Sequence, residues 1–116
     1  MRIQIKPLSA NILWRGRKFK TPEYQAYEQE FLYKLLRTEA PVFEQYILKA
    51  TFGFSNKSAD LSNPLKAFED ILQKKYGFND NKIYEIHLKK DIVAKGSEYI
   101  DFELLEYKEK IKLVEP

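Results

Sequence analysis

A short amphipathic helix with acidic residues before and after it is the feature that most constrains this chain. It lies within residues 58–82, which read SADLSNPLKAFEDILQKKYGFNDNK. Asn63 and Pro64 are typical of a helix start, and Gly77 is typical of a helix end. The apolar residues between them recur at spacings of three and four: Leu65, Phe68, Ile71, Leu72 and Tyr76. This periodicity predicts a helix of about three turns that buries one face.

Strand patterns surround this helix. Residues 2–6 alternate polar and apolar side chains, and Pro7 ends that pattern. Residues 42–54 are rich in β-branched and aromatic side chains, and their imperfect alternation indicates a bulge. Residues 83–93 and 99–105 predict two further strands, joined through a hairpin turn at residues 95–97.

A longer helix is predicted near the N-terminus. Thr21 provides a capping hydroxyl, Pro22 suits the first helical position, and the pattern continues to about residue 37. Its tyrosine and phenylalanine stripe is typical of a core rather than of a base-stacking platform. The predicted order β-α-β-α-β-β indicates one α+β domain over residues 1–116, a mixed sheet with two helices packed on one face. Residues 8–20 are expected to be irregular, and residues 111–114 are compatible with an edge strand or a dimer contact.

Composition limits the chemistry that the chain can carry. Its 116 residues suit one domain, and they include no cysteine and a single histidine. A disulfide framework, a thiolate zinc site and a histidine-rich metal site are therefore excluded. Any metal would be held by oxygen, which favours Mg²⁺, Mn²⁺ or Ca²⁺. No membrane-spanning stretch or secretory signal is visible, so a cytoplasmic location is expected.

Positive charge is concentrated in one short segment. The whole chain carries 20 basic and 17 acidic residues, but residues 15–20 read RGRKFK. A local patch of this kind can bind phosphates, and it is equally compatible with a solvated, flexible loop.

The residues around the short helix match the needs of phosphodiester hydrolysis. Asp60 and Asp80 can hold Mg²⁺ through two carboxylates if the fold brings them together. This requires a strand that starts near Asp80 and lies against the strand that ends before Asp60. In an extended segment Ser62 would face the same side as Asp60, where it offers a hydroxyl instead of a charge. Lys66, one turn into the helix, can neutralise charge on a phosphate, and Asn63 can cap the helix or donate an oxygen.

Most of these residues also have a structural interpretation. Lys66 can pair with Asp70 four residues later, and an isolated Asp60 or Asp80 is typical of a surface turn. His87 is expected to be a structural or surface histidine that shares a strand face with Glu85.

Two motifs in this order resemble a known family. The segments DLSNPLKAFEDIL (residues 60–72) and YGFND (residues 76–80), together with the upstream NILWRGR (residues 11–17), resemble the RusA family of Holliday junction resolvases, which prophages usually encode. The likeness extends over roughly residues 3–102. The family pattern D-x-D-N-x-x-K, with a later aspartate, falls on Asp60, Ser62, Asn63, Lys66 and Asp80, so that serine stands where the family has its second acid.

The resemblance implies a homodimer that cuts four-way DNA junctions in recombination and repair. It implies a Mg²⁺ site (Mn²⁺ possible) without a small-molecule cofactor, in which Asp60, Lys66 and Asp80 are catalytic and Asp60, Asp80 and Ser62 surround the metal. The residues implied in DNA binding are Asn11, Arg15, Arg17, Lys18, Lys20 and Asn63. Two alternatives remain: a junction-binding homodimer that lost cleavage with one carboxylate, and an interaction protein unrelated to nucleic acid.

Overall fold

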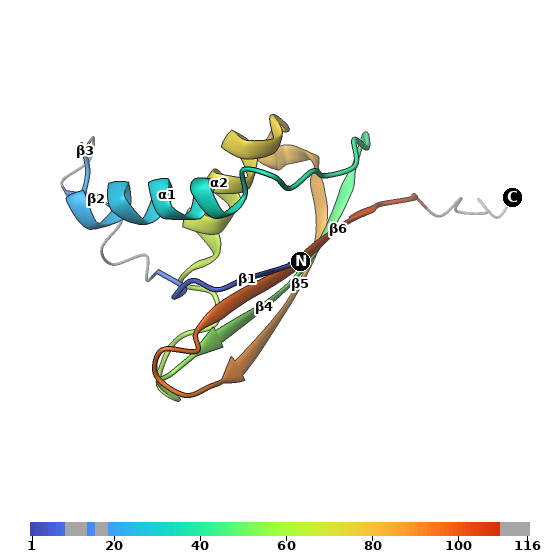
Figure 1. Cartoon of the computed structure of the whole chain (residues 1–116). Coiled ribbons are helices and arrows are strands. Elements are labelled where there is room, and N and C mark those ends of the chain that lie inside the picture. Colours follow the sequence, from blue (N-terminus) through green and yellow to red (C-terminus); the bar gives the residue numbers. More distant parts are fainter. Residues whose placement is uncertain (9–13, 16–18, 110–116) are drawn as a thin grey trace, which may run out of the picture.

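Four strands form one mixed sheet in the order β1-β6-β4-β5 (Figure 1). The computed structural model describes residues 1–8, 14–15 and 19–109. The strands of this sheet are β1 (Arg2–Ile3), β4 (Tyr46–Phe54), β5 (Ile83–Ile92) and β6 (Tyr99–Glu106). Two helices lie on one side of it, α1 (Pro22–Lys34) and α2 (Leu65–Tyr76). The predicted α+β domain with the order β-α-β-α-β-β is confirmed.

The N-terminal helix begins as its sequence predicts. The Thr21 hydroxyl accepts a hydrogen bond from the backbone N–H of Tyr24 at 3.1 Å, and Pro22 follows the cap directly. The helix ends at Lys34, earlier than the predicted residue 37, because residues 35–37 form a turn. Its aromatic stripe is buried in the core, as expected.

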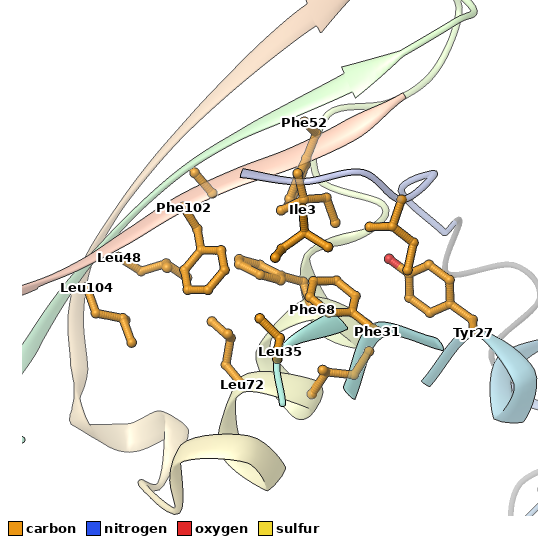
Figure 2. Close-up of a cluster of buried hydrophobic side chains, with 14 of the residues drawn as sticks. Ile3, Tyr27, Phe31, Leu35, Leu48, Phe52, Phe68, Leu72, Phe102 and Leu104 are labelled. Atoms are coloured by element: carbon orange, nitrogen blue, oxygen red, sulfur yellow. The ribbon is translucent and has the colours of Figure 1, made fainter. Parts of the chain in front are cut away.

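The centre of the core is Phe68 of α2, surrounded by aromatic rings from other elements (Figure 2). Its ring centroid lies 6.0 Å from that of Phe31, 5.7 Å from that of Phe52 and 5.4 Å from that of Phe102. Alternate residues of the central strand β4 point into this core: Tyr46, Leu48, Ala50, Phe52 and Phe54. Helix α2 is therefore held against the sheet by the face that its periodicity predicts.

The strands on either side of β4 run in opposite directions. β6 pairs with β4 antiparallel, whereas β5 pairs with β4 in parallel, from Tyr46 opposite Ile83 to Phe54 opposite Ile92. The prediction of a hairpin between residues 83–93 and 99–105 is wrong, because β4 lies between these two strands. The predicted turn itself is present, with Gly96 at φ 92°. Burial explains the arrangement, since β6 carries alternating core residues and β5 is exposed along most of its length.

Several boundaries differ from the sequence pattern. β1 covers only two of the residues 2–6, and β4 starts at Tyr46. The bulge expected within residues 42–54 lies instead in β5, where Tyr84 is the extra residue between the pairs Tyr46–Ile83 and Ile47–Glu85. Within the stretch expected to be irregular, β2 (Trp14–Arg15) pairs antiparallel with β3 (Phe19–Lys20). The possible strand at residues 111–114 lies outside the described residues. Neither described helix is long and apolar enough to cross a membrane.

Candidate functional site

Lys66, in the first turn of helix α2, lies close to Asp80, which follows the end of that helix. The chain turns back after Gly77, which has φ 76°, and enters the short 3-10 helix η2 (Asp80–Lys82). The backbone N–H of Asp80 donates to Oε1 of Gln73 at 3.0 Å, which holds this turn against the helix. As a result, Lys66 Nζ lies 3.8 Å from Asp80 Oδ2. The fold thus brings one predicted cation and one predicted acid to the same place.

Two further carboxylates on α2 surround this pair. Lys66 Nζ lies 3.2 Å from Asp70 Oδ1, so the alternative pairing predicted for Lys66 is also present. The hydrogen bond and charge of Asp70 raise the pKa of Lys66, although its side chain is 59% exposed and the pair is correspondingly weak. Burial, followed by the charge of Asp80, raises the pKa of Glu69. Residues 66, 69, 70 and 80 therefore form one acidic cluster with a lysine inside it.

Asp60 and Asn63 lie at a different place, beside a cavity of about 600 Å³. Ile5, Leu8, Tyr27 and Phe54 contribute apolar walls to this cavity, and Lys6, Glu30 and Glu98 contribute charged groups. Asp60 is exposed, and Ser62 is exposed without lining the cavity. Of the two predicted metal-binding positions of this loop, only Asp60 thus borders the cavity.

The local backbone explains why Asp60 and Ser62 do not have the arrangement expected of an extended segment. The prediction assumed an extended segment, but residues 61–64 form turns, in which the N–H of Asn63 donates to the carbonyl of Asp60 and that of Leu65 to the carbonyl of Ser62. A rule based on a period of two does not apply to turns. The assumption of an extended segment is therefore wrong, and the metal role of Ser62 stays a prediction.

Asn63 does not cap helix α2, contrary to the preferred interpretation of its position. The capping position is occupied by Pro64, and no side chain there bonds the first turn. The N–H groups of the first turn are partly engaged by backbone carbonyls, as in the bond from Leu65 N–H to Ser62 O at 3.1 Å. Asn63 instead borders the cavity.

A lysine from the edge strand positions the loop before Asp60. Lys90 Nζ of β5 donates to the carbonyl of Lys57 at 2.6 Å and to that of Ala59 at 2.5 Å. These bonds tie the loop to the sheet directly ahead of the predicted acid. Sequence reasoning missed Lys90, because only the parallel pairing of β5 with β4 brings it to this loop.

The strand pairing expected to join Asp60 to Asp80 is present, but its direction places the two residues at opposite ends of β4. A strand that starts near Asp80 does lie against β4, but the pairing is parallel. The beginning of β5 therefore lies beside the beginning of β4, whereas Asp60 follows the opposite end of β4. Within residues 1–8, 14–15 and 19–109, no group of three or more histidine, cysteine, aspartate or glutamate side chains is placed to hold a metal ion.

This donor set fits Mg²⁺ only in part. Asp60 borders the cavity, which Asp80 does not line, and Lys66 already neutralises Asp80 in part. Mg²⁺ keeps several waters and needs few protein ligands, so either carboxylate suits a hydrated ion. A cage of several carboxylates is not present among the described residues.

Of the predicted DNA contacts in the basic segment, the structure describes Lys20 and the backbone of Arg15. Lys20 Nζ lies 3.0 Å from Glu28 Oε2, so its charge is engaged in the fold. The backbone of Arg15 belongs to β2 and pairs with Phe19. Asn11, Arg17 and Lys18, the other predicted DNA contacts of this segment, lie outside the described residues.

His87 behaves as the sequence predicts. It is exposed on β5, and its Nε2 lies 2.7 Å from Oε1 of Glu85, the residue expected on the same face. Glu69 was missed, although its position one turn after Lys66 and next to Asp70 was a usable signal.

No known family model matches this chain, and no curated protein matches it.

Proposed function

We propose that this protein is a RusA-like, Mg²⁺-dependent endonuclease that acts on four-way DNA junctions. The observation that carries the proposal is the contact between Lys66 and Asp80 at 3.8 Å. It joins a residue in the first turn of helix α2 to a residue that follows the end of this helix, and both belong to the sequence pattern. A cation next to an acid at a helix surface is suited to a phosphate and its counterion. The order of the two sequence motifs and the α+β sheet are compatible with this family.

The proposed roles follow from position and charge. Lys66 is 59% exposed and can pair with a phosphate that approaches α2. Asp80 and Asp60 would hold hydrated Mg²⁺, which when bound supplies charge neutralisation and a more acidic water. Asn63 would contact DNA from the cavity rim, and the basic residues of the segment 15–20 would bind backbone phosphates without reading sequence.

Substitution of Asp80 tests this function. We expect Asp80→Asn to abolish Mg²⁺-dependent cleavage of a four-way junction while leaving junction binding in place, because the amide keeps the shape and loses the charge. Cleavage is measured with labelled junctions over a magnesium titration, and binding by gel shift. Asp101→Asn is a matched control, since Asp101 is 41% exposed against 39% for Asp80 and lies on β6. Full activity in Asp80→Asn would exclude the proposed site.

A second candidate function is a junction-binding homodimer with little or no nuclease activity. It is favoured by the exposed, uncharged Ser62 and by the missing three-ligand group in the described part of the chain. Under this proposal the chain recognises the junction through phosphates, and it would serve recombination without cutting.

Ser62→Asp separates the two candidates. If the natural protein is a weakened enzyme, the added carboxylate should raise the cleavage rate by orders of magnitude, because metal affinity rises with ligand charge. Ser58→Asp, at an exposed serine of the same loop, controls for added charge. Equal cleavage by the wild type and both variants would mean that position 62 does not act on the metal.

A further inference from the structure

The outer edge of β5 is free in the described part of the chain. β5 is the last strand of the order β1-β6-β4-β5, and its ten residues pair only with β4 there. The N–H of Val93, directly after β5, donates to the carbonyl of Phe54 in β4 at 2.8 Å. Because backbone groups alternate in direction along a strand, the even-numbered residues from Ile86 to Ile92 point their N–H and C=O groups outward. Such a row of outward groups is a template for pairing with another strand.

Apolar side chains accompany this free edge. Ile86 and Ile92 are 40% and 42% exposed, although they lie opposite the core residues Leu48 and Phe54 and so share the face of the sheet on which the helices lie. Figure 1 shows that α1 and α2 lie on that side of the sheet, over its interior. The edge therefore combines unpaired backbone groups with apolar surface, the two features that favour a partner strand.

We propose that a second copy of this chain binds here, with the two β5 strands antiparallel about a two-fold axis through His87. In this register Ile86 lies opposite Leu88 of the partner subunit, and Glu85 lies opposite Lys89 of the partner subunit. Each pair occurs twice by symmetry, which gives two apolar contacts and two opposite-charge contacts.

The charges of β5 favour this register over the one with the axis through Leu88. An axis through Leu88 would place Glu85 opposite Asp91 of the partner subunit, and like charges directly opposite are destabilising. It would also place His87 opposite Lys89 of the partner subunit. The axis through His87 pairs residues 85–89, which belong to the regular part of β5 after the register shift between Ile83 and Glu85. Lys90 does not obstruct it, because its amine is bonded to the carbonyls of Lys57 and Ala59.

The joined sheet would have both helix layers on one side. A two-fold axis that relates adjacent antiparallel strands of one sheet stands perpendicular to that sheet, so corresponding faces coincide. Both Lys66–Asp80 pairs would then lie on the same side of the dimer. The inference rests on the sheet edge alone, and its test involves no nuclease activity.

Cysteine cross-linking tests the register directly, since the chain has no cysteine of its own. In the proposed dimer the two residues at position 87 form a non-hydrogen-bonded pair with Cα atoms about 4.5 Å apart. This lies within the range of about 4.4 to 6.8 Å that a disulfide requires. His87 is 53% exposed, so His87→Cys should fold normally. We expect it to form a covalent dimer under mild oxidation, read on a non-reducing gel.

Lys89→Cys is the matched control on the same strand and face. The two copies of position 89 would be separated by four residues along the strands, about 13 Å, which a disulfide cannot span. We therefore expect little cross-linking from Lys89→Cys alone, and efficient cross-linking when Glu85→Cys is added to it. Equal cross-linking of His87→Cys and Lys89→Cys would overturn the proposed register.

Charge exchange gives a second, non-covalent test. Glu85→Lys should shift the protein toward monomer in sedimentation or light scattering, because it places two lysines opposite each other. Adding Lys89→Glu should restore the dimer, whereas Glu39→Lys, at an exposed glutamate before β4, should not change it. A wild-type protein that remains monomeric, or a double variant that fails to recover, would overturn the proposal.

Discussion

Gly53 provides the space through which Tyr99 crosses the helix-free face of the sheet. The two residues are direct partners on β4 and β6, and Tyr99 is 6% exposed. Its hydroxyl donates to Asp91 Oδ2 on β5 at 2.6 Å, and the guanidinium of Arg2 lies 3.9 Å from the ring centroid. One aromatic side chain thus links all four strands, and it does so over a residue without a side chain.

Gly53→Ala should therefore destabilise the protein, although alanine normally improves a strand. A Cβ at this position would lie 2.4 Å from Tyr99 Cδ1 and Cε1, so the ring, which Asp91 and Arg2 hold in place, must move. We expect a loss of about 1 to 3 kcal/mol in the free energy of unfolding, the usual cost of overpacking. Urea denaturation measures this loss.

The sign should reverse in a background that lacks the ring. In Tyr99→Ala, the further change Gly53→Ala should stabilise by about 0.4 to 1 kcal/mol, because alanine restricts the unfolded chain. The same loss in both backgrounds would show that Tyr99 is not the obstacle.

At the scale of secondary-structure elements, the sequence predicted helices better than strand pairing. Pro64, Gly77 and the apolar spacing placed α2 within one residue, and Thr21 with Pro22 placed the start of α1. These signals are local, because capping and periodicity depend on neighbouring residues. Strand direction is not local. The turn at residues 95–97 looked like a hairpin, yet β4 inserts between the two strands that it connects.

The same distinction holds for the candidate site. Lys66 meets Asp70 through a helix spacing that the sequence shows, and this pair was foreseen. Its contact with Asp80 depends on the turn at Gly77 and on the bond from Gln73, which no periodicity reveals. The separate location of Asp60 follows from the parallel pairing of β5, and the turns at residues 61–64 removed the expected alignment with Ser62.

At the scale of the whole molecule, one buried carboxylate joins three elements. Glu28 of α1 is 9% exposed, and its oxygens lie 3.0 Å from Lys20 Nζ of β3 and 2.6 Å from Lys74 Nζ of α2. Burial alone would raise the pKa of Glu28, but the hydrogen bonds from Lys74 and Lys20 outweigh it and hold the pKa below the ordinary value of 4.5. Folding therefore favours the ionised form of this group.

Glu28 should make stability depend on pH in the acid range. A carboxylate whose pKa is lower in the folded state than in the unfolded state stabilises the fold at pH values above the unfolded pKa, near 4.5. This contribution is lost as the pH falls through the folded pKa. At neutral pH we expect Glu28→Gln to lower the free energy of unfolding by about 1 to 3 kcal/mol, because two lysines lose their buried partner. As the pH falls below 4.5 and through the lower folded pKa, Glu28 of the wild type becomes neutral as well, so the difference should shrink. Urea denaturation at several pH values measures it, with the exposed Glu30→Gln as the control that changes stability little at any pH. A difference that stays constant across this range would mean that Glu28 acts through its shape and not through its charge.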